Sequence, residues 1–190
     1  MKGNFLKIIS LLFDPICSLT VLIIMLILNS NLAYDNKIFL IIAIFVFYIL
    51  APLQVIVYFL EKGWISDIEI KNRSQRIYIE IATLIFWLGG LIFVFNFEKI
   101  LFKSFVIIFI ELLICFIINF KLKISLHVSI YTLMIMLLTY AISAFVVIGL
   151  IFVPLIIYSR YKLHKHTLQE LFAGFIVPVI VVVFLWNMIL

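Results

Sequence analysis

The chain has 190 residues, of which 67% are hydrophobic and only 12% are charged, and its formal net charge is +5. Soluble domains contain about 45–50% apolar and about 25% charged residues, so this composition excludes a water-soluble protein. We therefore expect an all-α, polytopic transmembrane helix bundle of six to seven spans, formed as a single integral-membrane domain over residues 1–190. Its surroundings are the lipid bilayer, and no nucleic-acid partner is expected.

A bilayer core of about 30 Å requires about 20 apolar residues in a helix. By this measure the chain has clear spans near residues 15–29, 38–60, 77–96, 102–120 and 171–189. The first span has no small-residue cleavage site, so we expect it to be retained rather than removed as a signal peptide. The stretch 128–158 carries no formal charge and is too long for one upright helix but short for two. Ser143, Gly149 and Pro154 are the positions at which it would loosen or break.

The polar segment 159–170 carries residues suited to phosphate chemistry. Arg160 is a permanent cation whose planar guanidinium matches phosphate oxygens. His166 and Glu170 are four residues apart and share one face of a helix, so the carboxylate can hold one imidazole nitrogen and leave the other as a nucleophile or base. In the alternative interpretation, Arg160 and the nearby lysines are juxtamembrane anchors and His166 has no role.

The segment 121–127 places a second histidine before another apolar stretch. Lys121, Lys123 and Ser125 precede His127 there, at a helix start where backbone N–H groups also favour anions. A two-step phosphoryl transfer uses two such imidazoles, one to attack phosphorus and one to protonate the departing oxygen.

A third polar segment, 61–76, brings Arg73 and Arg76 to the start of the next span. On its own this segment is better explained as a solvated loop of mixed charge. Glu80 follows Arg76 by four residues and is expected to brace it. Glu111 lies near the middle of a span, where it is expected to be protonated or hydrogen-bonded, or to line a substrate pathway.

The last polar segment resembles the signature of the type 2 phosphatidic acid phosphatase family, whose superfamily includes the vanadium haloperoxidases. The final motif of that family is Ser-Arg, five residues, His, three residues and Asp. Here the same spacing connects Ser159 and Arg160 to His166 and then to Glu170. A Leu-Phe-Ala-Gly sequence that is also typical of the family follows at 171–174.

The other two segments resemble the family less completely. The middle motif, Pro-Ser-Gly-His, is matched only by Ser125 and His127. The first segment resembles an atypical bacterial branch with the pattern Asp-Arg-x-x-Arg, matched by Arg73 and Arg76 with Asn72 in place of the aspartate. The motif segments are therefore 61–76, 121–127 and 159–174.

This resemblance implies a role for each matched residue. His166 would be the nucleophile that forms a phosphohistidine, Glu170 would orient it, and His127 would protonate the leaving alcohol. The substrate phosphate would be held by Arg160, Ser125, Arg73, Arg76 and Lys123. No metal and no cofactor is expected, because side-chain cations neutralise the phosphate and the chain has no acidic ligand cluster.

The motifs also bear on the number of helices. A single helix over 128–158 would put His127 and His166 on opposite faces of the membrane, whereas two short helices, near 128–141 and 144–158, bring them to one face. That face then carries 11 of the 14 lysines and arginines. The positive-inside rule places it in the cytoplasm, in what we expect to be a bacterial inner membrane, although many bacterial relatives in the family work on the outer face.

The expected substrate is a lipid phosphate monoester or a polyprenyl diphosphate, whose tail stays in the bilayer while its headgroup meets the basic cluster. Two other classes remain open. One is a transporter or phospholipid-binding scaffold that recognises phosphate without cleaving it, for which Gly89, Gly90 and Glu111 are thin support. The other is a catalytically inactive relative with a structural role. A prenyltransferase would need paired Asp-rich motifs, which the segment 67–69 does not supply.

Overall fold

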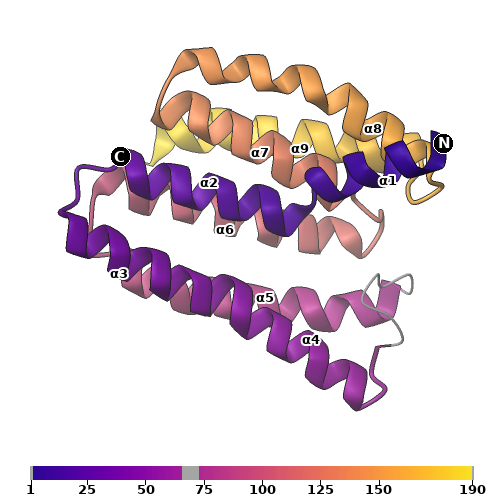
Figure 1. The fold of residues 1–190 in the computed structure, drawn as a ribbon, viewed down its shortest axis with the longest axis horizontal. Helices are drawn as coiled ribbons and strands as arrows, with labels where there is room; N and C mark the ends of the chain where they lie inside the picture. The colour runs from indigo at the N-terminus through magenta and orange to yellow at the C-terminus, as the bar shows by residue number, and fades with distance from the viewer. Residues whose placement is uncertain (1, 66–72, 190) are drawn as a thin grey trace. The chain divides into compact units, whose positions relative to one another are not determined.

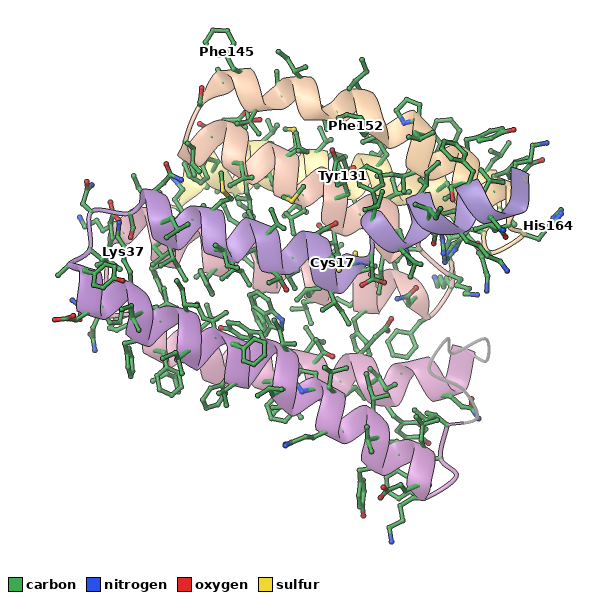
Figure 2. The ribbon with its side chains drawn as sticks, viewed as in Figure 1. Cys17, Lys37, Tyr131, Phe145, Phe152 and His164 are labelled. Atoms are coloured by element: carbon green, nitrogen blue, oxygen red, sulfur yellow. The ribbon has the colours of Figure 1, made fainter. Side chains whose placement is uncertain are left out.

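The computed structural model describes residues 2–65 and 73–189, apart from the side chains of residues 2, 3, 73, 74 and 76. These ranges consist of helices and turns without any strand, as the composition predicted. Six of the helices in them are long and apolar enough to cross a membrane. Large apolar side chains cover the outside, and Phe145, which is 82% exposed, points away from the helices (Figure 2). The protein is therefore a multi-pass helical membrane protein.

The chain divides into two compact units, which we call the terminal unit, Met1–Asn29 with Lys121–Leu190, and the middle unit, Ser30–Phe120. The α-helices of the terminal unit are α1 (Lys2–Leu12), α2 (Pro15–Asn29), α7 (Leu126–Ala141), α8 (Val153–Lys162) and α9 (Leu168–Met188). Helix α7 packs against α2, α8 and α9 (Figure 1). Its residues 128–138 are buried without interruption. An apolar helix surrounded in this way forms the core of the unit.

The predicted break in the long apolar stretch is confirmed. Helix α7 ends at Ala141, and Ser143 then caps a 3₁₀ helix, η2 (Ala144–Phe152), by accepting a hydrogen bond from Phe145 N at 3.4 Å. The 3₁₀ helix continues directly into α8, with Pro154 in the first turn of that helix, where its missing N–H costs little. A 3₁₀ helix rises about 2.0 Å per residue, so η2 and α8 together extend about 33 Å, enough to cross a bilayer. Helix α7 has 16 residues and rises only about 24 Å.

The N-terminal residues form a helix that the sequence did not predict. We expected the first span to begin at residue 15 after a polar segment, but α1 already covers Lys2–Leu12 and lies beside α8 (Figure 1). A break separates α1 from α2, because Asp14 Oδ1 accepts a hydrogen bond from Ile16 N at 2.9 Å and thereby caps α2. Pro15 occupies the first position of α2, where proline is favoured.

The middle unit contains α3 (Tyr34–Ile44), α4 (Ala51–Glu61), α5 (Arg73–Val94) and α6 (Lys99–Asn119). A π-helical turn, η1 (Phe45–Leu50), connects α3 to α4, so the predicted span near 38–60 is one continuous helix. The wider turn accommodates Pro52, which has no N–H to donate and whose ring would clash with the carbonyl four residues before it.

Two pairs of side chains form hydrogen bonds inside the middle unit. The thiol of Cys115 donates to Glu111 Oε1 at 3.3 Å, and Asn119 Nδ2 donates to Glu80 Oε1 at 2.6 Å. Glu111 is therefore hydrogen-bonded within the helices, one of the two outcomes expected for it. Trp87 is fully buried and stacks on Tyr48 with 4.0 Å between ring centroids, so it packs inside the unit.

Helix α9 approaches α7 closely at Gly174. A Cβ atom at this position would lie 2.8 Å from the backbone oxygen of Ser125 and 3.3 Å from Val128 Cβ. Backbone atoms cannot move aside as a flexible side chain can, so the close approach depends on glycine. This contact fixes the beginning of α7 against the beginning of α9.

We predict that Gly174→Ala lowers the free energy of unfolding by about 1–3 kcal/mol, because the added methyl group forces the two helices apart. Gly89→Ala in α5 is the matched control, since no described atom lies within 4 Å of the position that its methyl group would occupy. It should be neutral or stabilising by up to about 1 kcal/mol. Unfolding in mixed detergent micelles measures both values, and equal stability of the two variants would contradict the prediction.

Candidate functional site

The turn after α8 sets the spacing between Arg160 and His166. His164 N donates to Tyr161 O at 3.0 Å, and Lys165 N donates to Arg160 O at 3.1 Å. These two bonds form a Schellman motif, in which the residue after the C-cap adopts a left-handed conformation. His164 occupies that position with a φ of 54° and points away from the helices (Figure 2). It therefore shapes the turn and does not enter the candidate site.

The beginning of α9 sets the spacing between His166 and Glu170. Thr167 is the N-cap and accepts from Glu170 N at 3.4 Å, while Thr167 N donates to Glu170 Oε2 at 3.0 Å. This reciprocal pair is a capping box. His166 is the residue just before the cap, so its side chain returns toward the first turn of α9.

Both hydrogen-bond partners of the His166 ring act on the same nitrogen. Nδ1 lies 3.1 Å from Glu170 Oε2 and 3.2 Å from the carbonyl oxygen of Lys123. A carbonyl oxygen can only accept, and an ionised carboxylate also only accepts, so Nδ1 carries the proton. When the ring is neutral, Nε2 is therefore the nitrogen with the free lone pair, and it makes no hydrogen bond to a described residue.

The surroundings of His166 favour its neutral form. The ring is 5% exposed, and burial lowers its pKa to about 4. The positive charge of Arg160, and more weakly that of Lys123, acts in the same direction, while the hydrogen bond that the ring donates to Glu170 opposes them. His166 is thus a neutral imidazole at neutral pH, beside two cations.

Arg160 is held by the N-terminal helix. Its guanidinium Nη1 donates to Ser10 Oγ at 2.7 Å, and the hydroxyl of the neighbouring Ser159 donates to Leu6 O at 2.8 Å. Arg160 is only 7% exposed, so these contacts fix its position next to His166. Sequence reasoning assigned Ser10 no part in the site, because α1 was not predicted.

The second predicted segment meets the third at the start of α7. Ser125 N donates to the backbone oxygen of Glu170 at 3.2 Å, and Lys123 supplies the carbonyl that accepts from His166. The hydroxyl of Ser125 is buried and has no hydrogen-bond partner within the described parts of the chain. A buried hydroxyl without a partner costs about 1–3 kcal/mol, so a ligand oxygen would satisfy it.

His127 lies in the first turn of α7, with Nε2 3.9 Å from Asp14 Oδ2. Asp14 is a second residue that the sequence reasoning missed. Asp followed by Pro at the start of an apolar helix is a recognisable capping signal, but it predicts only a helix start. Nothing in that pattern indicates a partner more than a hundred residues away.

The first predicted segment contributes no described side chain. Asp67 and Asn72 lie outside the described residues, and the side chains of Arg73 and Arg76 lie outside them as well, although both residues belong to α5. The structure therefore brings five predicted residues together, some through backbone atoms and some through side chains. They are Lys123, Ser125, Arg160, His166 and Glu170. His127 begins the helix that follows the first two of them.

Chemically, the terminal unit presents a neutral imidazole with a fixed tautomer, two nearby cations and a buried hydroxyl without a partner in the described chain. This set can bind an oxyanion and offers one nucleophilic nitrogen. Comparison with known proteins finds no matching family model, no matching curated protein and no matching solved structure.

Proposed function

We propose that the protein is a metal-independent membrane lipid phosphatase that works through a phosphohistidine on His166. The proposal is based on the two contacts of His166 Nδ1. Glu170 and the Lys123 carbonyl occupy Nδ1, so the lone pair of Nε2 is available at neutral pH. Nucleophilic catalysis requires this state of an imidazole. The resemblance of the motif spacing to type 2 phosphatidic acid phosphatases supports the same reaction.

In the proposed first step, Nε2 attacks phosphorus and the bond to the lipid oxygen breaks. His127 gives its proton to that oxygen, which leaves as an alcohol, or as a monophosphate if the substrate is a diphosphate. In the second step water attacks the phosphohistidine, His127 accepts a proton from the water, and the N–P bond breaks to release inorganic phosphate. Arg160 and Lys123 offset the negative charge on the phosphoryl oxygens, and the Ser125 hydroxyl donates to one of them.

The substrate we propose is a lipid phosphate monoester or a polyprenyl diphosphate. Helices α8 and α9 are both long and apolar enough to cross the bilayer, α8 together with η2, and Arg160, His166 and Glu170 lie in or next to the turn between them. A lipid tail can therefore stay in the hydrocarbon while its phosphate reaches the cations, which attract anionic headgroups.

Phosphate recognition without hydrolysis is the second candidate function. It is favoured by the structural roles that two of the residues already have, since Glu170 completes a capping box and Arg160 holds α1 through Ser10. Both residues would be needed in a phospholipid-binding protein that has no catalytic step. Binding of a short-chain phosphatidate without any release of phosphate would support this candidate.

We predict that the wild-type protein releases phosphate from a short-chain phosphatidate or a polyprenyl diphosphate in the presence of EDTA. His166→Asn should reduce this activity at least about a thousandfold, because asparagine cannot form the covalent intermediate. His164→Asn is the matched control, since asparagine tolerates the left-handed turn position and His164 points away from the site. Equal activity of the two variants would rule out His166 as the nucleophile.

We predict that the His166 ring stays neutral, with its proton on Nδ1, well below neutral pH. Its pKa of about 4 lies below the ordinary value of 6.5, so the ring gains its second proton only as the pH falls through about 4, and about nine tenths of it is neutral at pH 5. Nitrogen NMR of histidine-labelled protein measures this directly, because the chain has 3 histidines and His166→Asn assigns the signal. A charged ring at pH 6, or a proton on Nε2, would contradict the proposed nucleophile.

We also propose that the site faces the cytoplasm of a bacterial inner membrane. The reason is that most of the lysines and arginines are expected on the same membrane face as His127 and His166. In a background of Cys17→Ala and Cys115→Ala, a single cysteine from Lys162→Cys should resist a membrane-impermeant maleimide in intact cells. One from Tyr34→Cys, at a position that is 77% exposed and expected on the other face, should react. The reverse pattern would place the site on the outer face.

A further inference from the structure

The N-terminal segment reaches the candidate site at two points. Ser10 accepts from Arg160, and Asp14 Oδ2 lies 3.9 Å from His127 Nε2. The two residues are four positions apart, Ser10 in the last turn of α1 and Asp14 in the break before α2. One short stretch of chain therefore contacts the predicted phosphate-binding arginine and the predicted general acid.

Asp14 has little freedom to turn away from His127. Its other carboxylate oxygen, Oδ1, accepts from Ile16 N at 2.9 Å, and its backbone oxygen accepts from Ser18 N at 2.9 Å. Helix α1 is fixed in turn by Leu6 and Ser10, which bind the Ser159 hydroxyl and the Arg160 guanidinium. Contacts within the terminal unit thus hold Asp14 at the start of α2 and hold helix α1 before it.

The geometry points to Asp14 as a positioning residue for His127, a role that rests on the phosphatase function proposed above. A general acid must hold its proton until the leaving oxygen develops negative charge. A carboxylate 3.9 Å from Nε2 attracts the protonated imidazole and favours the ring orientation that turns Nε2 toward it, with Nδ1–H directed away from Asp14. The proton that reaches the lipid oxygen is then the one on Nδ1.

The distinguishing test compares two leaving groups. An alkyl phosphate leaves as a strongly basic alkoxide and needs a proton, whereas a nitrophenyl phosphate with a matched alkyl chain leaves as a weakly basic phenolate and needs little help. We expect Asp14→Asn to lower kcat about tenfold for the alkyl phosphate and less than about twofold for the nitrophenyl phosphate. Asparagine can still cap α2, so the helix start is kept. Asp35→Asn, the same change in the first turn of α3, is the matched control and should alter neither rate.

A second comparison links the effect to His127. His127→Ala should show the same dependence on the leaving group, and adding Asp14→Asn to it should cause no further loss for the alkyl phosphate. If Asp14→Asn fails to fold, as judged by thermal unfolding, Asp14→Ser keeps a capping side chain that is too short to reach His127 and should give the same pattern.

The outcomes separate this inference from the proposed function. If the wild type releases phosphate and His166→Asn does not, but Asp14→Asn slows both substrates equally or neither, only the role of Asp14 is overturned. Independent, additive losses from Asp14→Asn and His127→Ala would overturn it as well. If the wild type releases phosphate from neither substrate, the phosphatase function and the role of Asp14 are both overturned.

Discussion

The proton on His166 Nδ1 has two acceptors, and they belong to different parts of the terminal unit. Glu170 lies in the first turn of α9, whereas the Lys123 carbonyl precedes α7. A parallel bond from Ser125 N to the Glu170 backbone oxygen joins the same two segments. The helix starts can approach this closely because Gly174 leaves room for the Ser125 carbonyl. The tautomer of His166, the position of Lys123 and the packing of α7 on α9 are therefore consequences of one local arrangement.

The capping box gives a physical reason for the glutamate at position 170. A capping box uses Glu or Gln at the third helical position, because the side chain must reach back to the N–H of the cap. Glu170 Oε2 meets that requirement at Thr167 N and reaches His166 Nδ1 with the same oxygen. The family that the motif resembles has aspartate there. Glutamate is longer by one methylene group, and in this chain it occurs together with Thr167 as the helix cap. Glu170 thus stabilises the start of α9 and also orients the imidazole of His166.

Much of the fold could be predicted from the sequence, because about 20 apolar residues per span is a strong constraint. The break near Ser143 was predictable, since one unbroken helix would have put His127 and His166 on opposite faces of the membrane. Helix α1 was missed because its 11 residues include polar ones and are too few to cross a bilayer. The contacts of Ser10 and Asp14 depend on tertiary packing, and no local pattern encodes them. The capping box was readable from Thr167 and Glu170.

Helix α1 has 11 residues and packs against α8. The polar part of that packing consists of Ser159 and Arg160, the residues that also begin the last motif. Arg160 consequently has a structural role that would persist without any catalysis, and its loss would disturb α1 and the site together. His166 differs, because its structural contacts use only Nδ1 and leave Nε2 without a hydrogen-bonding role among the described residues. The buried imidazole is thus held through one nitrogen, and among the described residues its contacts account for the packing of α7 on α9 but not for Nε2.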